Sequence, residues 1–240
     1  GKTIDELEKI ENIDESLILW RSSIQWLGGI YFFISLISIL GTSRVKIKAA
    51  YLVPSEFFGG NFYNNFFVNS FKIFLIYFAG TILIFSLYMV SDIRFFNGFN
   101  LAMSVISSGG FLSENSLNKI IRNDFQFFIL TLTFLIPLFN FFFFYKIILR
   151  KFKYLDYFED FYNFLFVCFV VFILYFFITN EENILSLFFI TLSSVANIGI
   201  NVESSNPDLS FLFLLLTIIG GSSVSVTSGF KTSRIYLLLK

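Results

Sequence analysis

Long apolar stretches alternate with short polar ones along the whole chain. A helix needs roughly 20 apolar residues to cross a bilayer, and several stretches reach that length. Spans are predicted at 17–40, 71–92, 125–148 and 161–179, and a fifth begins near residue 209. The chain is therefore expected to be a multi-pass, all-α integral membrane protein.

Two apolar segments are too short to span the bilayer, 94–106 and 184–196. Their length suits a re-entrant helix that enters the membrane halfway and turns back. Each is followed by a loop that contains glycine. The order of long span, short helix, glycine loop and long span occurs twice, at 71–148 and at 161–240, which predicts an internal repeat.

The charged residues predict an orientation. Lys and Arg cluster in 41–72 and 146–160, so these links should face the cytoplasm by the positive-inside rule. The segments 1–16, 92–123 and 180–208 should then face outside. Both short helices would enter from the outer side.

Composition narrows the chemistry. The chain is 56% hydrophobic and 14% charged, with 38 Phe, whereas soluble domains are about 25% charged. The formal net charge is zero, which gives no bulk attraction to nucleic acid. There is no His and a single cysteine, Cys168, so internal disulfides, His/Cys metal sites and Ser-His-Asp or Cys-His catalysis are excluded. We expect no enzyme and no cofactor.

The two glycine loops have the composition of an ion-binding site. A dehydrated cation needs oxygen atoms at close range, and backbone carbonyls of an extended loop supply them. Glycine permits the backbone angles that such loops need. The predicted ligands are in Ser108, Gly109, Gly110, Ile198 and Gly199. Either loop alone could be a simple outer turn, but two at matching places in a repeat favour an ion pathway.

The fifth apolar stretch breaks into Gly, Ser and Thr at 220–229 before it resumes. Small residues also allow close helix packing, but a span that breaks at membrane depth must bond its free backbone groups to protein or to a water-filled path. We interpret the break as a mobile constriction. The residues assigned to this gate are Gly220, Gly221, Ser225, Thr227, Gly229 and Lys231.

Three stretches together resemble the Trk/Ktr/HKT superfamily of potassium transporters, and in particular its TrkH-like membrane subunits. Residues 20–29, WRSSIQWLGG, resemble the family's "WRSxxQWLGG" helix. Residues 99–111, FNLAMSVISSGGF, resemble its "HAxSTxxTGGFST" pore loop, and 218–231, IIGGSSVSVTSGFK, its "FIGGxxGSTGGGIK" broken helix. The resemblance covers essentially the whole chain.

The resemblance implies four repeats around one potassium pathway, each with a span, a pore helix, a filter loop and a span. It makes Gly110 the filter glycine of the second repeat and Gly199 that of the third, and it matches Gly1 to the end of the first filter. The implied units are 1–48 (end of the first repeat), 49–153 (the second) and 154–240 (the third, with a broken closing helix). The fourth repeat is expected to lie outside this chain, which we interpret as part of a longer polypeptide.

The implied function is potassium uptake across a bacterial cytoplasmic (inner) membrane, with potassium as the transported substrate. The implied partners are membrane lipid, a second copy of the chain and a cytoplasmic nucleotide-binding regulatory subunit. The chain departs from the family pattern at Asn197-Ile-Gly, where Thr-Thr-Gly is usual, and in the reduced glycine run before Lys231. The alternative is therefore a non-conducting truncated or split paralogue that acts as a membrane scaffold.

Overall fold

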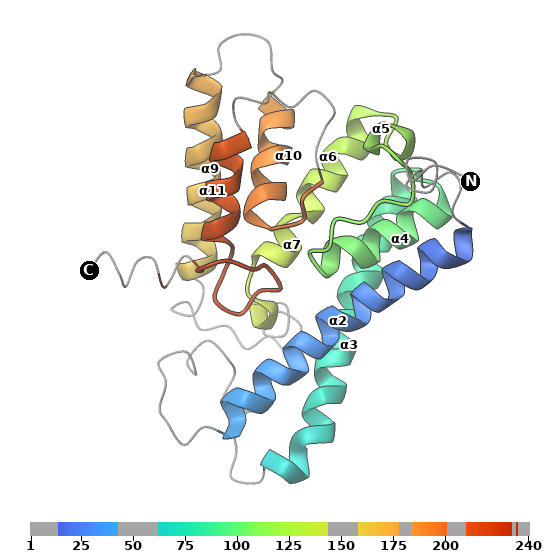
Figure 1. The fold of residues 1–240 in the computed structure, drawn as a ribbon, viewed down its shortest axis with the longest axis vertical. Helices are drawn as coiled ribbons and strands as arrows, with labels where there is room; N and C mark the ends of the chain where they lie inside the picture. The colour runs from blue at the N-terminus through green and yellow to red at the C-terminus, as the bar shows by residue number, and fades with distance from the viewer. Residues whose placement is uncertain are drawn as a thin grey trace, which may run out of the picture.

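The computed structural model describes residues 14–42, 62–143, 158–177, 184–200 and 210–231, and also Arg234. These residues form helices joined by turns and loops, and they contain no strand (Figure 1). The predicted all-α class is confirmed. The helices are α2 (Glu15–Thr42), α3 (Phe62–Val90), α4 (Phe95–Ile106), α5 (Leu117–Ile120), α6 (Asp124–Thr133), α7 (Leu135–Leu138), α9 (Phe158–Phe177), α10 (Ile184–Val195) and α11 (Ser210–Ile219).

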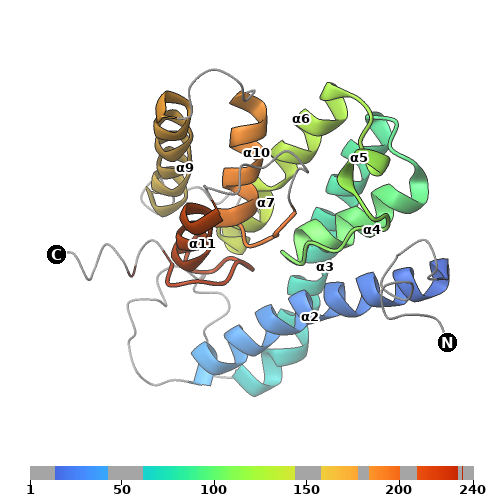
Figure 2. The same cartoon turned by 45° about the horizontal axis from the view of Figure 1, so that its top comes forward.

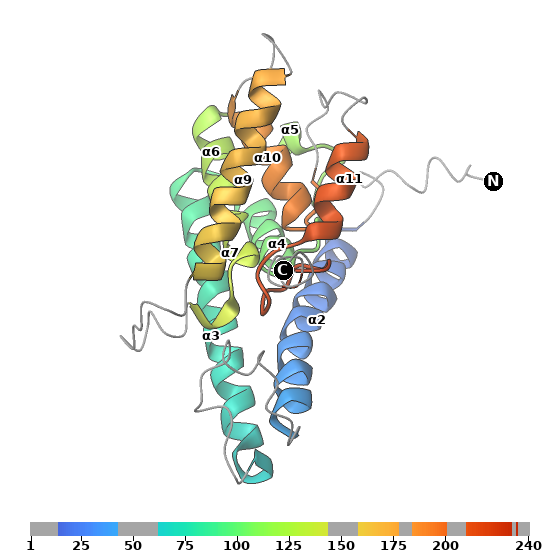
Figure 3. The same ribbon diagram turned by 90° about the vertical axis from the view of Figure 1, so that its left-hand side faces the viewer.

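The two longest helices, α2 and α3, lie side by side and extend beyond the others (Figures 1 and 3). Trp26 Nε1 donates to Thr81 Oγ1 at 2.9 Å between them, and the rings of Phe33 and Tyr77 meet edge to face. Helix α3 begins at Phe62, earlier than the predicted start at 71. The prediction placed the start where apolar residues become continuous, but a helix can extend past the apolar part of its sequence.

The predicted third span, 125–148, is not one continuous helix, and this prediction is wrong. The helix is interrupted, and its segment α7 ends at Leu138. Pro137 has no N–H to give to the preceding turn. Beyond it the amide of Phe141 donates at 2.8 Å to the carbonyl of Val224, far along the chain, instead of to its own helix. Residues 144–150 lie outside the described part.

Among the described residues, one helical stretch, Phe66–Val90, is both long and apolar enough to cross a membrane. Other apolar helices are shorter in the described part, among them Asp124–Leu138 and Phe161–Tyr175. Large apolar side chains are exposed on the outer helices. Phe67 of α3 and Phe172 of α9 have 81% and 68% of their surface accessible. Such exposed apolar surface is typical of a contact with lipid or another protein.

The short helices α4 and α10 lie inside the molecule. All residues of α4 from Leu101 to Ile106 are buried, as are those of α10 from Phe189 to Val195. Helix α4 packs on α2 and α3, and α10 packs on α9 and α11. Both short helices point their C-terminal loops toward the middle of the molecule (Figures 1 and 2). This is the placement expected of re-entrant helices, whose central position brings two distant loops together.

Candidate functional site

Helix α4 ends in a tight cap that sets the backbone of the following loop, residues 107–111, here called the α4 loop. The amide of Ser108 donates to the carbonyl of Val105 at 3.0 Å, and that of Gly109 donates to Ser104 at 2.8 Å. This pair of bonds is the Schellman motif, which needs a left-handed residue just after the helix. Ser108 has that conformation, with φ 52°, and Gly110 has a φ of 70°.

Helix α10 ends with the same geometry at the matching positions of residues 196–200, here called the α10 loop. Asn197 donates its amide to the carbonyl of Ser194 at 3.1 Å, and Ile198 donates to Ser193 at 2.9 Å. The left-handed residues are Asn197, with φ 55°, and Gly199, with φ 74°. Two stretches far apart in the sequence therefore form one backbone motif after two helices of equal length.

The two loops touch each other at the residues predicted to bind ions. A Cβ atom added to Gly110 would overlap the carbonyl oxygen of Ile198, so only glycine fits there. A Cβ atom added to Gly199 would meet nothing within 4 Å. The C-termini of α4 and α10 carry partial negative charge toward this point. The contact brings the carbonyl of Ile198 and the negative ends of two helix dipoles together, an arrangement suited to a cation.

The α4 loop is attached to helix α2. Arg21 donates to the carbonyl of Leu112 at 3.2 Å, and its guanidinium carbon lies 4.3 Å from the centre of the Phe111 ring. The side-chain amide of Gln25 lies against Gly109 and fills the space that a Cβ atom would take. Sequence reasoning did not assign these two side chains a role, although both lie in the motif quoted for α2.

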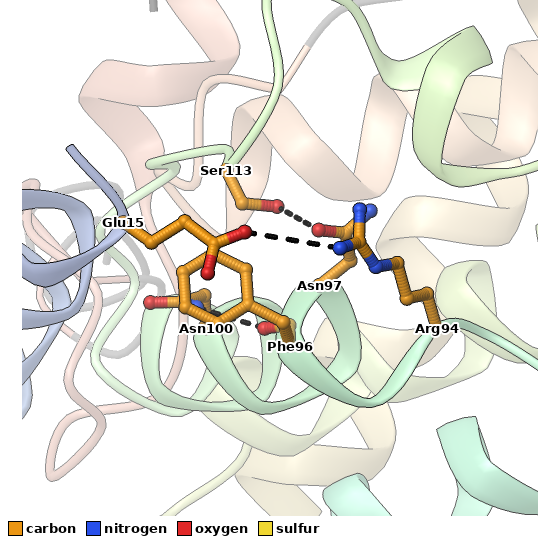
Figure 4. A network of polar contacts seen from close by, with 6 residues as sticks. All are labelled: Glu15, Arg94, Phe96, Asn97, Asn100 and Ser113. Carbon is orange, nitrogen blue, oxygen red and sulfur yellow. Dashed lines mark hydrogen bonds and ion pairs between the residues drawn. The ribbon is translucent and has the colours of Figure 1, made fainter. Parts of the chain in front are cut away.

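The N-terminal end of α4 and the chain that follows its loop are held by polar contacts (Figure 4). Ser113 Oγ donates to Asn97 Oδ1 at 3.0 Å and ties the chain after the loop back to α4. Glu15 and Arg94 form an exposed ion pair at 3.8 Å between the starts of α2 and α4. Exposed pairs contribute little stability, roughly 0–1 kcal/mol, so the buried Ser113 bond is the stronger fastening.

The α10 loop is attached to a different part of the molecule. Ser193 Oγ donates to the carbonyl of Ile200 at 2.7 Å, which fixes the chain leaving the loop. Asn197 Nδ2 donates to the carbonyls of Thr217, at 3.2 Å, and Ser228, at 3.4 Å. This loop therefore bonds directly to the broken fifth helix.

The break in the fifth helix is a closed loop, residues 220–231, here called the polar loop, which lies below α11 in Figure 1. The chain leaves α11 and returns beside it. Phe230 donates its amide to the carbonyl of Ile218 at 2.8 Å, and Lys231 donates to Ile219 at 2.9 Å. The carbonyls at a helix end otherwise lack partners, so the returning chain completes the helix that the break interrupted.

Glycine allows the two ends of the polar loop, where the chain leaves α11 and where it returns, to approach each other. Gly220 and Gly229 have φ of 71° and 96°. A Cβ atom on Gly220 would overlap the carbonyl oxygen of Ser228, and one on Gly229 would come within 2.7 Å of that of Ile218. The reduced glycine run of this chain still has glycine at both positions where the loop closes.

Lys231 is buried, with 8% of its surface accessible, and its ammonium group lies inside the polar loop. It donates to Ser225 Oγ at 3.0 Å and to Thr227 Oγ1 at 3.1 Å, and it also contacts the backbone carbonyls of both residues. Thr227 Oγ1 in turn accepts the amide of Gly221. Lys231, one of the residues assigned to the gate from the sequence, is thus enclosed by its own loop.

The polar loop docks on the interrupted third span and on α9. Ser222 donates its amide to the carbonyl of Leu138 at 3.0 Å, and Val224 accepts the amide of Phe141. Asn163 of α9 donates to Ser222 Oγ at 2.7 Å. Sequence reasoning missed Asn163. The available signal was a buried amide inside an apolar span, where polar groups are costly and often functional.

A cavity of about 190 Å³ lies between α3, the end of α4, α7 and the polar loop. Its lining is mostly apolar and includes Tyr77, Ile106, Pro137 and Val226. In the described part of the chain, no group of three or more His, Cys, Asp or Glu side chains could hold a metal ion. The candidate cation ligands are therefore the backbone carbonyls and hydroxyls of the loops.

Two comparisons with known proteins relate to this arrangement. The crystal structure of the potassium transporter TrkH from Vibrio parahaemolyticus matches 96% of this chain with a TM-score of 0.78 and 19% identity. A protein of Methanocaldococcus jannaschii named as an uncharacterized cation transporter is 26% identical over 239 residues, 98% of this chain. No model of a known protein family matches the chain.

The structural match confirms that the chain has a TrkH-like fold, as the sequence motifs predicted, and both relatives are named as transporters. Both names agree with the membrane protein that the sequence predicts. It spans about half the length of the proteins it matches, 49% of TrkH and 48% of the archaeal relative. The limits of the predicted repeats, and the roles of the loop residues, stay predictions.

Proposed function

We propose that this chain forms part of a potassium-uptake protein and contributes two ion-coordinating loops and one gate. The observation that carries the proposal is the contact between the two matching caps, where Gly110 lies against the carbonyl of Ile198. Potassium is the substrate named for TrkH, and the archaeal relative is named a cation transporter. Both names agree with the chemistry of the loops.

The loops would coordinate dehydrated potassium through backbone carbonyls. The left-handed residues would turn carbonyls of both loops toward the ion, and α4 and α10 would present their negative dipole ends to it. The ligands proposed from the α4 loop are in Ser108, Gly109 and Gly110, and those from the α10 loop are in Ile198 and Gly199. The remaining ligands would come from the other repeats of the complete protein.

The polar loop would act as the gate. It bonds to the α10 loop through Asn197, so that its movement would reach the proposed ion ligands. Lys231 would keep the closed loop compact, because its ammonium gathers oxygen atoms from Ser225 and Thr227. A cytoplasmic nucleotide-binding subunit would shift the balance between the closed and the open form of this loop. We further propose a homodimer in the bacterial inner membrane.

The test replaces Gly110 by Asp in the complete protein, expressed in cells that lack other potassium importers. Rubidium uptake should be abolished, because the side chain would meet the carbonyl of Ile198 and carry charge into the space between the loops. The control is Gly28→Ala on α2, where an added Cβ atom meets nothing within 4 Å. It should transport normally. Normal uptake by the Asp variant at normal membrane level would refute the site.

The same experiment distinguishes potassium transport from the scaffold alternative. A scaffold would insert at normal level and give no rubidium uptake even with native Gly110. Uptake by the native protein that depends on Gly110 would exclude it.

A further inference from the structure

We propose that Asn197 couples the α10 loop to the gate, so that movement of the polar loop changes the position of a potassium ligand. It would be a positioning residue, acting through the backbone of its neighbour Ile198. The inference rests on the proposed function, but the two hydrogen bonds of Asn197 to the polar loop and α11 can be tested independently of it.

The first step concerns which donors the carbonyl groups at the end of α11 accept. In a continuous helix the carbonyl of Thr217 would accept the amide of Gly221, but that amide donates to Thr227 Oγ1 instead. The carbonyl of Thr217 accepts Asn197 Nδ2. A residue outside the fifth helix thus supplies the bond that the break removed.

The second step is the position of the other bond. Ser228 lies on the returning strand of the polar loop, opposite α11, and its carbonyl also accepts Asn197 Nδ2. A primary amide has two N–H donors, so one side chain can hold both strands where they converge. Opening the polar loop by separating these strands would break at least one of the two bonds.

The third step leads to the ion site. Ile198 follows Asn197 directly, and its carbonyl oxygen faces Gly110 of the α4 loop. Asn197 is itself the left-handed cap residue of α10. A displacement of its side chain therefore acts on the one peptide unit that separates it from the proposed ligand.

Within the described residues, no side chain of the α4 loop bonds to the polar loop. Ser108 occupies the matching position, and its buried hydroxyl has no hydrogen-bond partner among the described residues. That loop is fastened to α2 by Arg21 and Gln25. The structure thus connects one of the two loops to the gate and the other to a long helix.

The test uses the complete protein in lipid nanodiscs and in cells, with two substitutions. Asn197→Gly keeps the left-handed backbone without the side chain. Asn197→Asp keeps the shape but turns an acceptor toward two carbonyl oxygens. We expect amide hydrogen exchange in residues 220–231 to be about fivefold to tenfold faster in both variants, as the loss of two modest hydrogen bonds implies, and fastest with Asp.

The second readout is the ratio of rubidium to sodium uptake. Deleting Val224–Thr227 from the polar loop should change this ratio when Asn197 is present and leave it unchanged in the Asn197→Gly background. Exchange equal to native in both variants, or a ratio that shifts equally in both backgrounds, would overturn the coupling. If the native protein takes up no rubidium, the proposed function fails. Hydrogen exchange then still shows whether Asn197 holds the polar loop.

Discussion

The α4 loop and the α10 loop have the same backbone and different attachments. Each follows a 12-residue helix, with left-handed residues at the second and fourth positions after it. The first is fixed to α2 through Arg21 and Gln25, and the second to the polar loop through Asn197. The comparison teaches that backbone geometry can be repeated while side chains decide which copy is anchored and which can respond.

The largest effect should come from the contact between the loops. We expect Gly110→Ala to lower rubidium uptake about 100-fold, since displacing a reacting or binding group by about 1 Å can cost that much. Gly199→Ala meets open space and suffers only the left-handed strain of about 1 kcal/mol, roughly a fivefold loss. Uptake rates at matched membrane levels give the comparison. Equal losses would mean that the overlap with Ile198 is not decisive.

The next effect concerns the responsive side of the comparison. Deleting Val224–Thr227 removes the two hydroxyl groups to which Lys231 donates, those of Ser225 and Thr227. It also removes the carbonyl of Val224 that accepts the amide of Phe141. We expect rubidium flux through the complete protein to rise about tenfold, the change that loss of one or two bonds to a charged group implies, and its regulation to weaken. Unchanged or lower flux in a properly inserted variant would indicate a structural role for this segment.

A smaller effect is expected on the anchored side. Gln25→Ala removes the side chain that fills the space against Gly109. We expect rubidium uptake to fall about threefold, in line with the loss of one modest contact, while hydrogen exchange of the polar loop stays native. Faster exchange in residues 220–231 would show that the α4 loop is also connected to the gate.

The last prediction tests the orientation of the α4 loop, which the charge pattern places with 92–123 outside and with 146–160 inside, and its readout is labelling and not a rate. In a Cys168→Ala background, Asn118→Cys should react with an impermeant thiol reagent from outside, and Lys151→Cys should not. Asn118 is exposed on α5, whereas the nearby Ser113 is buried. Labelling of position 151 from outside would contradict the orientation predicted from the Lys and Arg clusters.

Much of the fold could be predicted because membrane thickness ties length to role. The segments 94–106 and 184–196 were too short to span, and the structure places α4 and α10 almost at those limits. The glycines of both loops were identifiable because left-handed positions favour glycine. The same rule says nothing about Ser108 and Asn197, which adopt that conformation in the caps.

The remaining features depend on partners that are distant in the chain. The third span is interrupted where the amide of Phe141 finds the carbonyl of Val224, and no local pattern encodes that pairing. Lys231 is buried because hydroxyls and carbonyls of its own loop surround it. A positive-inside count treats every lysine as a surface charge, so it could not predict this.

The docking of the polar loop on the interrupted span has a consequence for sequence variation. Two of its contacts, Ser222 N–H to Leu138 and Phe141 N–H to Val224, join backbone to backbone. Such bonds do not depend on side-chain identity, but the side chain of Val224 is buried in the core with 4% of its surface accessible, so only apolar residues of similar size should preserve the docking. The side-chain bond from Asn163 to Ser222 has no such tolerance. Variation in this segment should therefore be limited to residues of similar size at Val224, while insertions and deletions are eliminated.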